Sequence, residues 1–197
     1  MQSGIRCTVI AGKVKLENQK NNMVILMVGP SCGGKTTLAV EYCATNPNSI
    51  RVEMDKLIND QFPEASAAIH RGITASPYFE ATVKLLNSFA ESDNEIRLVD
   101  IGAGSIVDPR AVSLFQSGQH KVITISPGPQ VAYERARAHR PQWRHKTLEQ
   151  YMEVEFSENR QAIYQSALVT IDTSKDLATC TGQLSHTIAE LNQKEQS

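Results

Sequence analysis

The chain has 197 residues, of which 41% are hydrophobic and 21% are charged, and its formal net charge at pH 7 is -1. This length predicts one well-buried domain, and the composition argues against a disordered or fibrous chain. The nearly neutral charge excludes a general attraction to nucleic acid or to an anionic membrane, so any anion-binding site must be local.

The cysteines and the apolar runs indicate the compartment. Four cysteines are scattered through the sequence without a CxxC pair or a metal-ligand spacing to histidine, which argues against a zinc site or a disulfide framework. No signal-peptide core opens the sequence, and the longest apolar run, around 24–28, is too short to span a bilayer. We therefore expect a cytoplasmic protein.

Short apolar runs alternate with helical patterns after a mixed N-terminal extension, residues 1–22. Runs typical of strands occupy 23–28, 50–54, 96–100, 121–125 and 167–172. Helical patterns are found at 35–44, up to about 90, after Asp108, after Ser126, from about Thr147 and from about Ser174. This alternation predicts an α/β domain over 23–197, with a mostly parallel sheet and helices on both faces.

Residues at the predicted boundaries support this alternation. A capping side chain precedes a proline suited to the first helical position at Asp108-Pro109, Ser126-Pro127 and Ser76-Pro77. Thr147 and Gln150 have the spacing of a capping box, which predicts the start of one long helix. Within the extension, GIRCTVIAG predicts a short strand and KLENQKNN a polar connector.

The stretch from Gly29 to Thr36 fits G-x-x-x-x-G-K-[ST] and lies between a predicted buried strand and a predicted helix, as a phosphate-binding loop requires. Glycines let backbone N–H groups converge, and the helix N-terminus adds a positive end. Lys35 is expected to reach the β- and γ-phosphates of ATP, and the Thr36 hydroxyl to bind Mg²⁺. An ordinary glycine-rich turn is the alternative. The predicted nucleotide-binding residues here are Gly29, Pro30, Ser31, Cys32, Gly33, Gly34, Lys35, Thr36 and Thr37.

Two further strand ends carry carboxylates. In an extended segment Glu53 and Asp55 would point the same way, one holding water on the metal and the other accepting a proton from a substrate hydroxyl. Asp100 ends another strand as a Walker B aspartate does, and would contribute to the Mg²⁺ shell. The small residues that follow it would admit a substrate to the backbone. A surface carboxylate with a helix cap, and a plain turn, are the alternatives.

An arginine-rich segment covers 133–146 and contains Arg135, Arg137, Arg140 and Arg144. Such a run is most often a solvated helix face, and a nucleic-acid patch is another option that the nearly neutral net charge disfavours. In a phosphate-transfer enzyme, arginines on a mobile connector would close over ATP and neutralise charge on the transferring group.

These motifs resemble the shikimate kinases, within the small P-loop kinases related to nucleoside monophosphate kinases, over roughly 23–172. VEMD is similar to the family's D-x-D segment, with Glu53 replacing the first aspartate. DIGAGSIV is similar to its triple-glycine segment, with Ala103 in the middle, and AHRPQW resembles the lid arginine-proline. ENRQAIYQSALVTIDT resembles the E-R-x-P-L-Y segment and its following strand, with Arg160 and Tyr164 matching and Ala162 replacing the proline.

The resemblance implies a three-layer α/β/α P-loop kinase fold with a five-stranded parallel sheet and a mobile lid at about 139–147. It implies that ATP and Mg²⁺ are used to phosphorylate a hydroxyl of a small molecule. Asp55 would activate that hydroxyl, Arg160 would pair with an acceptor carboxylate, and Arg135 or Arg137 would contact the adenine. The expected catalytic residues are Lys35, Asp55 and Arg140, the substrate-binding residues Asp55, Gly102, Ala103, Gly104 and Arg160, and the metal-binding residues Thr36, Glu53 and Asp100.

One family arginine is absent from this chain. It belongs early in the helix after the D-x-D region, where this sequence has Phe79 followed by Glu80. Charge-assisted pairs of this kind are worth about 1.5–3 kcal/mol each, so a carboxylate acceptor would lose an important partner. Arg71 lies a little upstream, at a spacing that does not guarantee a substitution.

The first hypothesis is an ATP-dependent small-molecule kinase, with shikimate or a close analogue as the first acceptor and a sugar acid such as gluconate as the second. The second hypothesis is a nucleotide-binding regulatory or pseudo-kinase module without turnover, motivated by Glu53, Glu80, Ala103 and Ala162. A nucleic-acid kinase rests on the basic segment alone. We expect ATP and a small hydroxylated metabolite as partners of a monomer or homodimer, and no membrane partner.

Overall fold

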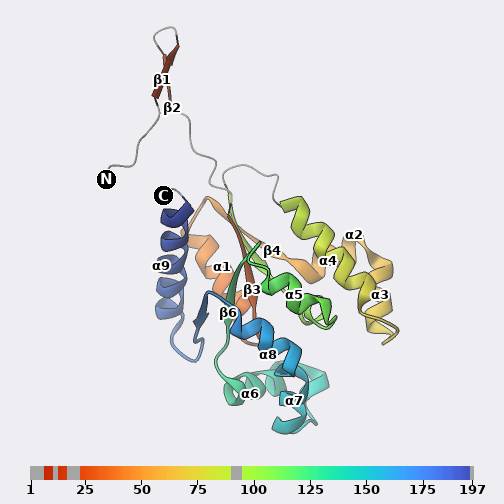
Figure 1. Ribbon diagram of the computed structural model, residues 1–197. Helices are drawn as coiled ribbons and strands as arrows, with labels where there is room; N and C mark the ends of the chain where they lie inside the picture. Colours follow the sequence, from red (N-terminus) through yellow and green to blue (C-terminus); the bar gives the residue numbers. More distant parts are fainter. Residues whose placement is uncertain (1–6, 11–12, 17–22, 90–94, 196–197) are drawn as a thin grey trace.

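A computed structural model describes residues 7–10, 13–16, 23–89 and 95–195. Its centre is the predicted five-stranded parallel sheet, in which the strands follow the order β4-β5-β3-β6-β7 (Figure 1). The strands are β3 (Met23–Val28), β4 (Ser49–Glu53), β5 (Ile96–Asp100), β6 (Lys121–Ile125) and β7 (Val169–Ile171). Because β3 lies between β5 and β6, the loop that follows β3 lies in the middle of the edge where all strands end.

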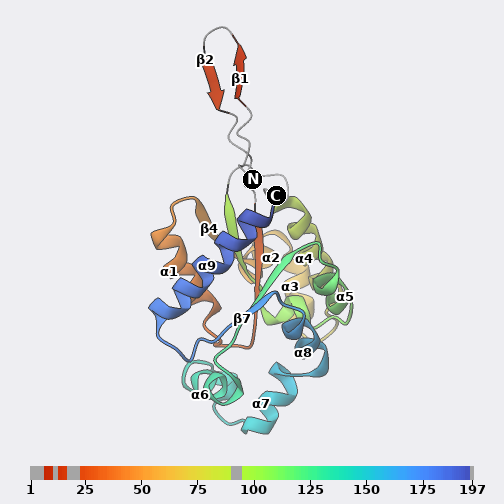
Figure 2. The same ribbon diagram turned by 60° about the vertical axis from the view of Figure 1, so that its left-hand side comes forward.

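Helices cover both faces of this sheet. They are α1 (Lys35–Thr45), α2 (Met54–Gln61), α3 (Pro63–His70), α4 (Ser76–Phe89), α5 (Arg110–Gln116), α6 (Pro129–His139), α7 (Leu148–Glu155), α8 (Glu158–Gln165) and α9 (Leu177–Glu195). Two short 3-10 turns, η1 (Ala103–Ile106) and η2 (Pro141–Trp143), lie between them. Figure 2 shows α9 crossing the sheet beside α1. Among the described residues, no helix has the length and apolar character needed to cross a membrane.

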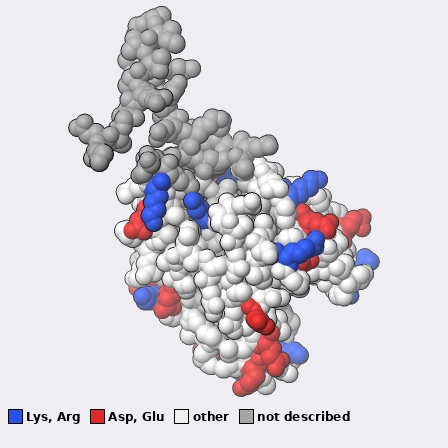
Figure 3. Space-filling view, in the orientation of Figure 1, with Lys and Arg blue, Asp and Glu red and all other residues white. Residues whose placement is uncertain are grey.

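The alternation of side chains along β3 explains the three layers. Leu26 and Val28 pack on one face, in a core shared with α2, α3, α4, α5 and α8, whereas Ile25 and Met27 pack on the other, in a core shared with α1 and α9. Successive strand residues point to opposite faces, so a strand that is apolar at both sets of positions requires cover on both sides. On the face drawn in Figure 3, acidic and basic side chains lie in small mixed groups, in keeping with the nearly neutral net charge.

Two predicted boundaries are wrong. The helix expected at Ser126-Pro127 begins at Pro129, because Gly128 adopts a φ of 82° and the Ser126 hydroxyl accepts a hydrogen bond from its N–H. The single long helix expected from Thr147 is divided into α7 and α8, which are separated by Phe156 and Ser157. Polar or glycine residues close to a strand end can therefore form a turn first and delay the helix.

The N-terminal extension includes a short antiparallel hairpin, formed by β1 (Cys7–Ile10) and β2 (Lys13–Leu16). The strand expected within 4–12 corresponds to β1, and the start of the expected polar connector belongs to β2. Residues 1–6, 11–12 and 17–22 lie outside the described residues. The division into an extension at 1–22 and a kinase domain at 23–197 stays a prediction.

The capping box at the start of α7 provides a test of the fold. The Thr147 hydroxyl oxygen accepts a hydrogen bond from the Gln150 backbone N–H at 3.3 Å, and the Thr147 backbone N–H donates to Gln150 Oε1 at 3.1 Å. We expect Thr147→Ala to lower the free energy of unfolding by about 1 kcal/mol, measured by denaturant titration. The control is Thr187→Ala within α9, where the hydroxyl only bonds back to Gln183 and a change below about 0.5 kcal/mol is expected. Equal losses in the two variants would contradict the role of the cap.

Candidate active site

An open cleft of about 1220 Å³ lies where the sheet strands end. Its walls come from the loop between β3 and α1, from the ends of β4 and β5, from α2 to α4 and from the segment around Arg140. In parallel α/β sheets this edge is where ligands bind, since the strand ends and the connecting loops leave a crevice there. The predicted phosphate-binding, carboxylate and lid segments therefore share one cavity.

The loop from Gly29 to Gly34 has the conformation of an anion nest. Gly29 and Gly34 have φ values of 146° and 98°, and Cys32 is the one non-glycine residue with positive φ among those described. A Cβ on Gly29 would lie 2.0 Å from the Ile125 carbonyl oxygen, so only glycine fits beside β6. Residues Ser31 to Leu38 line the cleft, whereas Gly29 and Pro30 are not among its lining residues.

Lys35 lies at the base of this loop. Its Nζ donates hydrogen bonds to the carbonyls of Gly29 at 3.0 Å and Pro30 at 3.2 Å. Burial lowers the pKa of the Lys35 ammonium, while the carboxylates of Asp100, Glu155 and Asp55 oppose this effect in decreasing order. A half-buried cation that is bonded to loop carbonyls is suited to pair with a polyphosphate.

Thr36 and Asp100 form the part of the site that fits Mg²⁺. The Thr36 hydroxyl donates to Asp100 Oδ2 at 2.5 Å, so one hydroxyl and one carboxylate lie together at the loop. Glu53 is the register partner of Asp100 on the adjacent strand, but its carboxylate pairs with Arg51 at 2.6 Å. No group of three or more Asp, Glu, His or Cys side chains in the described residues is placed to hold a metal. Mg²⁺ commonly takes one or two protein ligands together with phosphates and water, so the pair suffices.

Asp55 reaches the cleft from a helix. The extended segment predicted for Glu53 and Asp55 is wrong, because β4 ends at Glu53 and Asp55 lies in the first turn of α2. Its carboxylate accepts a hydrogen bond from the Tyr78 hydroxyl at 2.7 Å and lies against Gly102, where an added Cβ would be 1.9 Å from Oδ2. Burial raises the pKa of Asp55, and the Tyr78 hydrogen bond opposes the increase. A carboxylate with a raised pKa, held in a cleft, is suited to accept a proton.

The arginines of the basic segment divide between cleft and surface. Arg135 and Arg140 line the cleft, and Arg135 donates to the Thr173 carbonyl at 2.8 Å. Arg137 is exposed, and its guanidinium lies 5.5 Å from the centroid of the Tyr133 ring. Of the two arginines expected at the adenine, the structure therefore brings only Arg135 to the cleft.

Arg160 does not line the cleft in the part of the chain that the structure describes. It is buried, and it pairs with the buried carboxylate of Glu155 at 2.8 Å. Glu155 also accepts hydrogen bonds from the Ser31 backbone N–H at 3.0 Å and the Ser31 hydroxyl at 2.7 Å, and Tyr151 donates to the Ser31 carbonyl at 2.9 Å. The predicted acceptor-binding arginine is thus part of an internal network that supports the phosphate loop.

The comparisons with known proteins agree with this geometry. The sequence profile described as shikimate kinase matches residues 31–190, from the phosphate loop to α9. The chain belongs to the shikimate kinase family. No significant match was found among curated protein sequences.

Solved structures of shikimate kinases have the same fold as this family member. The enzyme from Bacteroides thetaiotaomicron gives a TM-score of 0.66 at 20% identity, covering 85% of this chain and 98% of that chain. The enzyme from Acinetobacter baumannii in complex with shikimate gives a TM-score of 0.62 at 15% identity, covering 89% of this chain and 96% of that chain. A gluconokinase from Sinorhizobium meliloti 1021 gives a TM-score of 0.58 at 16% identity, covering 89% of this chain and 97% of that chain. At these identities the likeness shows the P-loop kinase fold alone.

Three residues that the sequence did not single out complete the site of this shikimate kinase family member. Tyr78 holds Asp55, Glu155 holds Ser31, and the Thr173 hydroxyl donates to the Gly33 carbonyl at 2.5 Å. Thr173 comes soon after the end of β7, and the ends of parallel strands form the edge where ligands bind. This position was the one feature of the sequence that pointed to Thr173 as a site residue. Tyr78 and Glu155 lie in helices, where nothing in their spacing distinguishes them from core or surface residues.

The contact between Tyr78 and Asp55 predicts a change in pH dependence. Because the hydroxyl donates to the carboxylate, it lowers the pKa of Asp55, and Tyr78→Phe removes that effect. A general base must be unprotonated, so we expect the acidic limb of the kcat/KM profile to move to higher pH in Tyr78→Phe. The measurement is a pH–rate profile of both proteins with the same acceptor. A limb that stays in place, or moves to lower pH, would show that Asp55 does not control it.

Proposed function

We propose that this protein transfers the γ-phosphoryl group of ATP to a hydroxyl group of a small metabolite. The observation that carries the proposal is that Lys35 and Asp55 line the same cleft, with the Thr36–Asp100 pair also in its wall. A nest for polyphosphate and a carboxylate for the acceptor hydroxyl are the two parts that a phosphoryl transfer needs.

In the proposed reaction the loop from Gly29 to Thr37 binds the phosphates through backbone N–H groups, and Lys35 pairs with the β- and γ-phosphates. Thr36 and Asp100 would hold Mg²⁺, which neutralises phosphate charge when bound. Asp55 orients the acceptor hydroxyl and accepts its proton. The hydroxyl oxygen forms a bond to the γ-phosphorus while the bond from that phosphorus to the bridging oxygen breaks, and ADP leaves.

Residues 139–147 are proposed as the lid of the site. Arg140 at its start lines the cleft, while Trp143 is anchored edge-on to Tyr151 with ring centroids 4.9 Å apart. Tyr151 in turn bonds to the phosphate loop through Ser31. In the proposed reaction Arg140 would lie over the nucleotide, and closure of the lid would exclude water from the transfer.

The test is release of ADP from Mg-ATP in the presence of a panel of hydroxylated metabolites. Acceptor-dependent ADP release, with a phosphorylated product identified by mass spectrometry, supports the proposal. A protein that binds ATP tightly in calorimetry but turns over none of the panel would instead be a nucleotide-binding module without turnover. The burial of Arg160 against Glu155 is the observation that favours this second function.

The relatives suggest which acceptors to assay first. One solved relative is a complex of a shikimate kinase with shikimate, and another is a gluconokinase. Shikimate and its close analogues are therefore assayed first and gluconate second. Both compounds are acids, so the charge of the acceptor side of the cleft decides how well either would bind.

A further inference from the structure

The acceptor side of the cleft is poor in positive charge. We define the acceptor region as the cleft-lining residues within 54–78 and 102–107, which surround Asp55. No lysine or arginine of the described chain is among them, and their one basic side chain is His70. The lysines and arginines of the cleft belong to the phosphate loop, the lid side and the segment after β7, namely Lys35, Arg135, Arg140 and Lys175.

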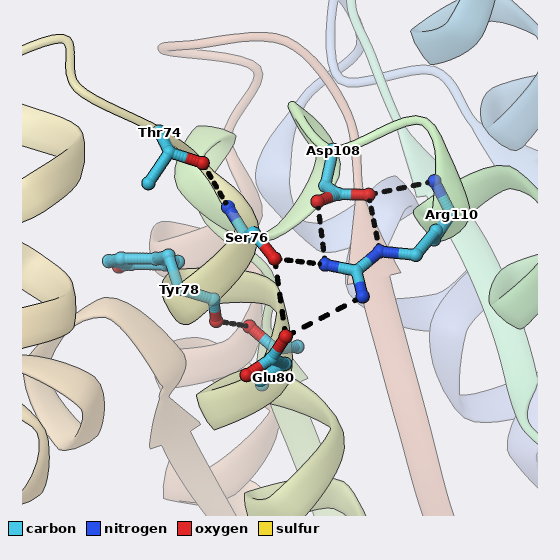
Figure 4. Close-up of polar contacts among 7 residues, drawn as sticks. Thr74, Ser76, Tyr78, Glu80, Asp108 and Arg110 are labelled. Atoms are coloured by element: carbon cyan, nitrogen blue, oxygen red, sulfur yellow. Dashed lines mark hydrogen bonds and ion pairs between the residues drawn. The ribbon is translucent and has the colours of Figure 1, made fainter.

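Arg110 lies near this region but is already neutralised (Figure 4). Its Nε and Nη2 donate to the two carboxylate oxygens of Asp108, each at 2.9 Å, and Nη2 also donates to the Ser76 hydroxyl at 2.6 Å. Glu80, in the stretch where the family arginine is missing, adds a carboxylate 3.6 Å from Nη1. The guanidinium lies 4.7 Å from the centroid of the Phe79 ring. Two carboxylates and a ring face leave Arg110 poorly placed to bind a further anion.

Arg160, the arginine expected from the resemblance to pair with an acceptor carboxylate, is also neutralised. Its side chain is 7% exposed and that of Glu155 is 4% exposed, and the two are in contact. If Arg160 turned toward a substrate carboxylate, the carboxylate of Glu155 would be left buried without its cation, which is strongly unfavourable. Glu155 also holds the phosphate loop through Ser31, so the exchange would disturb nucleotide binding as well.

The remaining groups of the acceptor region suit hydroxyl groups. Asn59, Ser66 and Tyr78 offer amide and hydroxyl groups, and the Ser66 hydroxyl donates to Asn59 at 3.2 Å. Negative charge is supplied by Asp55, and Asp100 lines the same cleft. An acidic acceptor would meet carboxylates of like charge and no permanent cation in this region, whereas a neutral polyol would find hydrogen-bond partners.

We propose that the acceptor is a polyhydroxylated compound without an acidic group, either uncharged or positively charged. This inference rests on the proposed kinase function and names the acceptor class of the same site. It excludes shikimate and gluconate as preferred acceptors, because each carries a carboxylate. The site would recognise a set of hydroxyl groups on the acceptor, one of which is hydrogen-bonded to the Asp55 carboxylate.

The experiment compares matched acceptors at saturating Mg-ATP. The pairs are methyl shikimate with shikimate, and glucitol with gluconate, and kcat/KM is measured for each by ADP release. Where both compounds of a pair are phosphorylated, we expect the kcat/KM of the neutral compound to exceed that of the acid by about tenfold or more. This is the size of effect that the loss of one charge-assisted hydrogen bond to the acid would cause. A better acidic member would overturn this inference and leave the kinase function intact. If neither these compounds nor any metabolite of the wider panel promoted ADP release, the kinase function itself would fail, and the inference with it.

A designed cation tests the physical reason. Asn59→Arg places a guanidinium in the acceptor region, and we expect it to shift the ratio of neutral to acidic kcat/KM toward the acid by about tenfold or more. Gln61→Arg is the matched control, because it adds the same charge at an exposed position of α2 that does not line the cleft. A ratio that is the same in Asn59→Arg, Gln61→Arg and the unmodified protein would contradict selection by the charge of this region.

Discussion

Lys35→Ala is expected to lower kcat for acceptor-dependent ADP release by about 10²- to 10³-fold, the range found when one preorganised donor to developing charge is removed. The Lys35 ammonium donates hydrogen bonds to the Gly29 and Pro30 carbonyls at the base of the phosphate loop. The measurement is steady-state turnover together with calorimetric binding of nucleotide. We expect binding to weaken as well, because the ammonium pairs with phosphate in the ground state too.

The control for Lys35→Ala is Lys56→Ala. Lys56 is exposed and pairs only with Asp60 within α2, so its removal changes the net charge equally without touching the cleft. Turnover close to that of the unmodified protein is expected for Lys56→Ala. If Lys35→Ala turned over substrate at the same rate as Lys56→Ala, the loop would not be the phosphate site of a kinase.

Asp55→Asn is expected to lower kcat by about 10²- to 10⁴-fold, the usual contribution of a positioned general base, while nucleotide affinity stays the same. The amide keeps the size of the side chain and can still accept the Tyr78 hydrogen bond, but it cannot take the acceptor proton. Single-turnover kinetics and nucleotide titration separate the two effects. A variant with full activity would remove Asp55 from the mechanism, whereas a loss of nucleotide affinity alone would reassign it to the phosphate side.

The same variant has a defined effect on stability. Burial is the largest cause of the raised pKa of Asp55, so the folded state binds the proton more tightly than the unfolded state does. The stability of the fold therefore falls as pH rises from the unfolded pKa through the folded one, and above that window the ionised carboxylate destabilises the protein. At those pH values Asp55→Asn should unfold at the same or a higher denaturant concentration. Asp60→Asn, at an exposed position on α2, is the control for both activity and stability.

The raised pKa and the geometry of Asp55 come from one arrangement of small and aromatic residues. Gly102 leaves room for the carboxylate and Gly104 leaves room for the Tyr78 ring, which a Cβ would approach to 2.8 Å. Both glycines therefore serve close approach between η1 and the helices that face it. The glycines of this segment were predicted to admit a substrate, and in the structure their immediate neighbours are Asp55 and Tyr78.

Local chemistry was sufficient to predict a large part of the fold and of the site. The five strands were predicted near their observed positions because each is a short apolar run that needs cover on both faces. The phosphate loop followed from glycine, lysine and threonine at fixed spacing, and the start of α7 from the capping pair Thr147 and Gln150. In each case the deciding interactions join residues only a few positions apart.

The roles of the charged residues were the part that the sequence by itself did not determine. Glu155 meets Ser31 and Arg160, and Arg110 meets Glu80, only after separate helices have packed on the sheet. The sequence alone determined that a glycine-rich loop with the phosphate-binding pattern follows a buried strand, because the backbone conformation there follows from neighbouring residues. Only the tertiary structure decided which arginines already have a carboxylate partner. The packing of the helices sets which carboxylate lies beside each arginine, and a buried charge is stable only when an opposite charge is in contact with it.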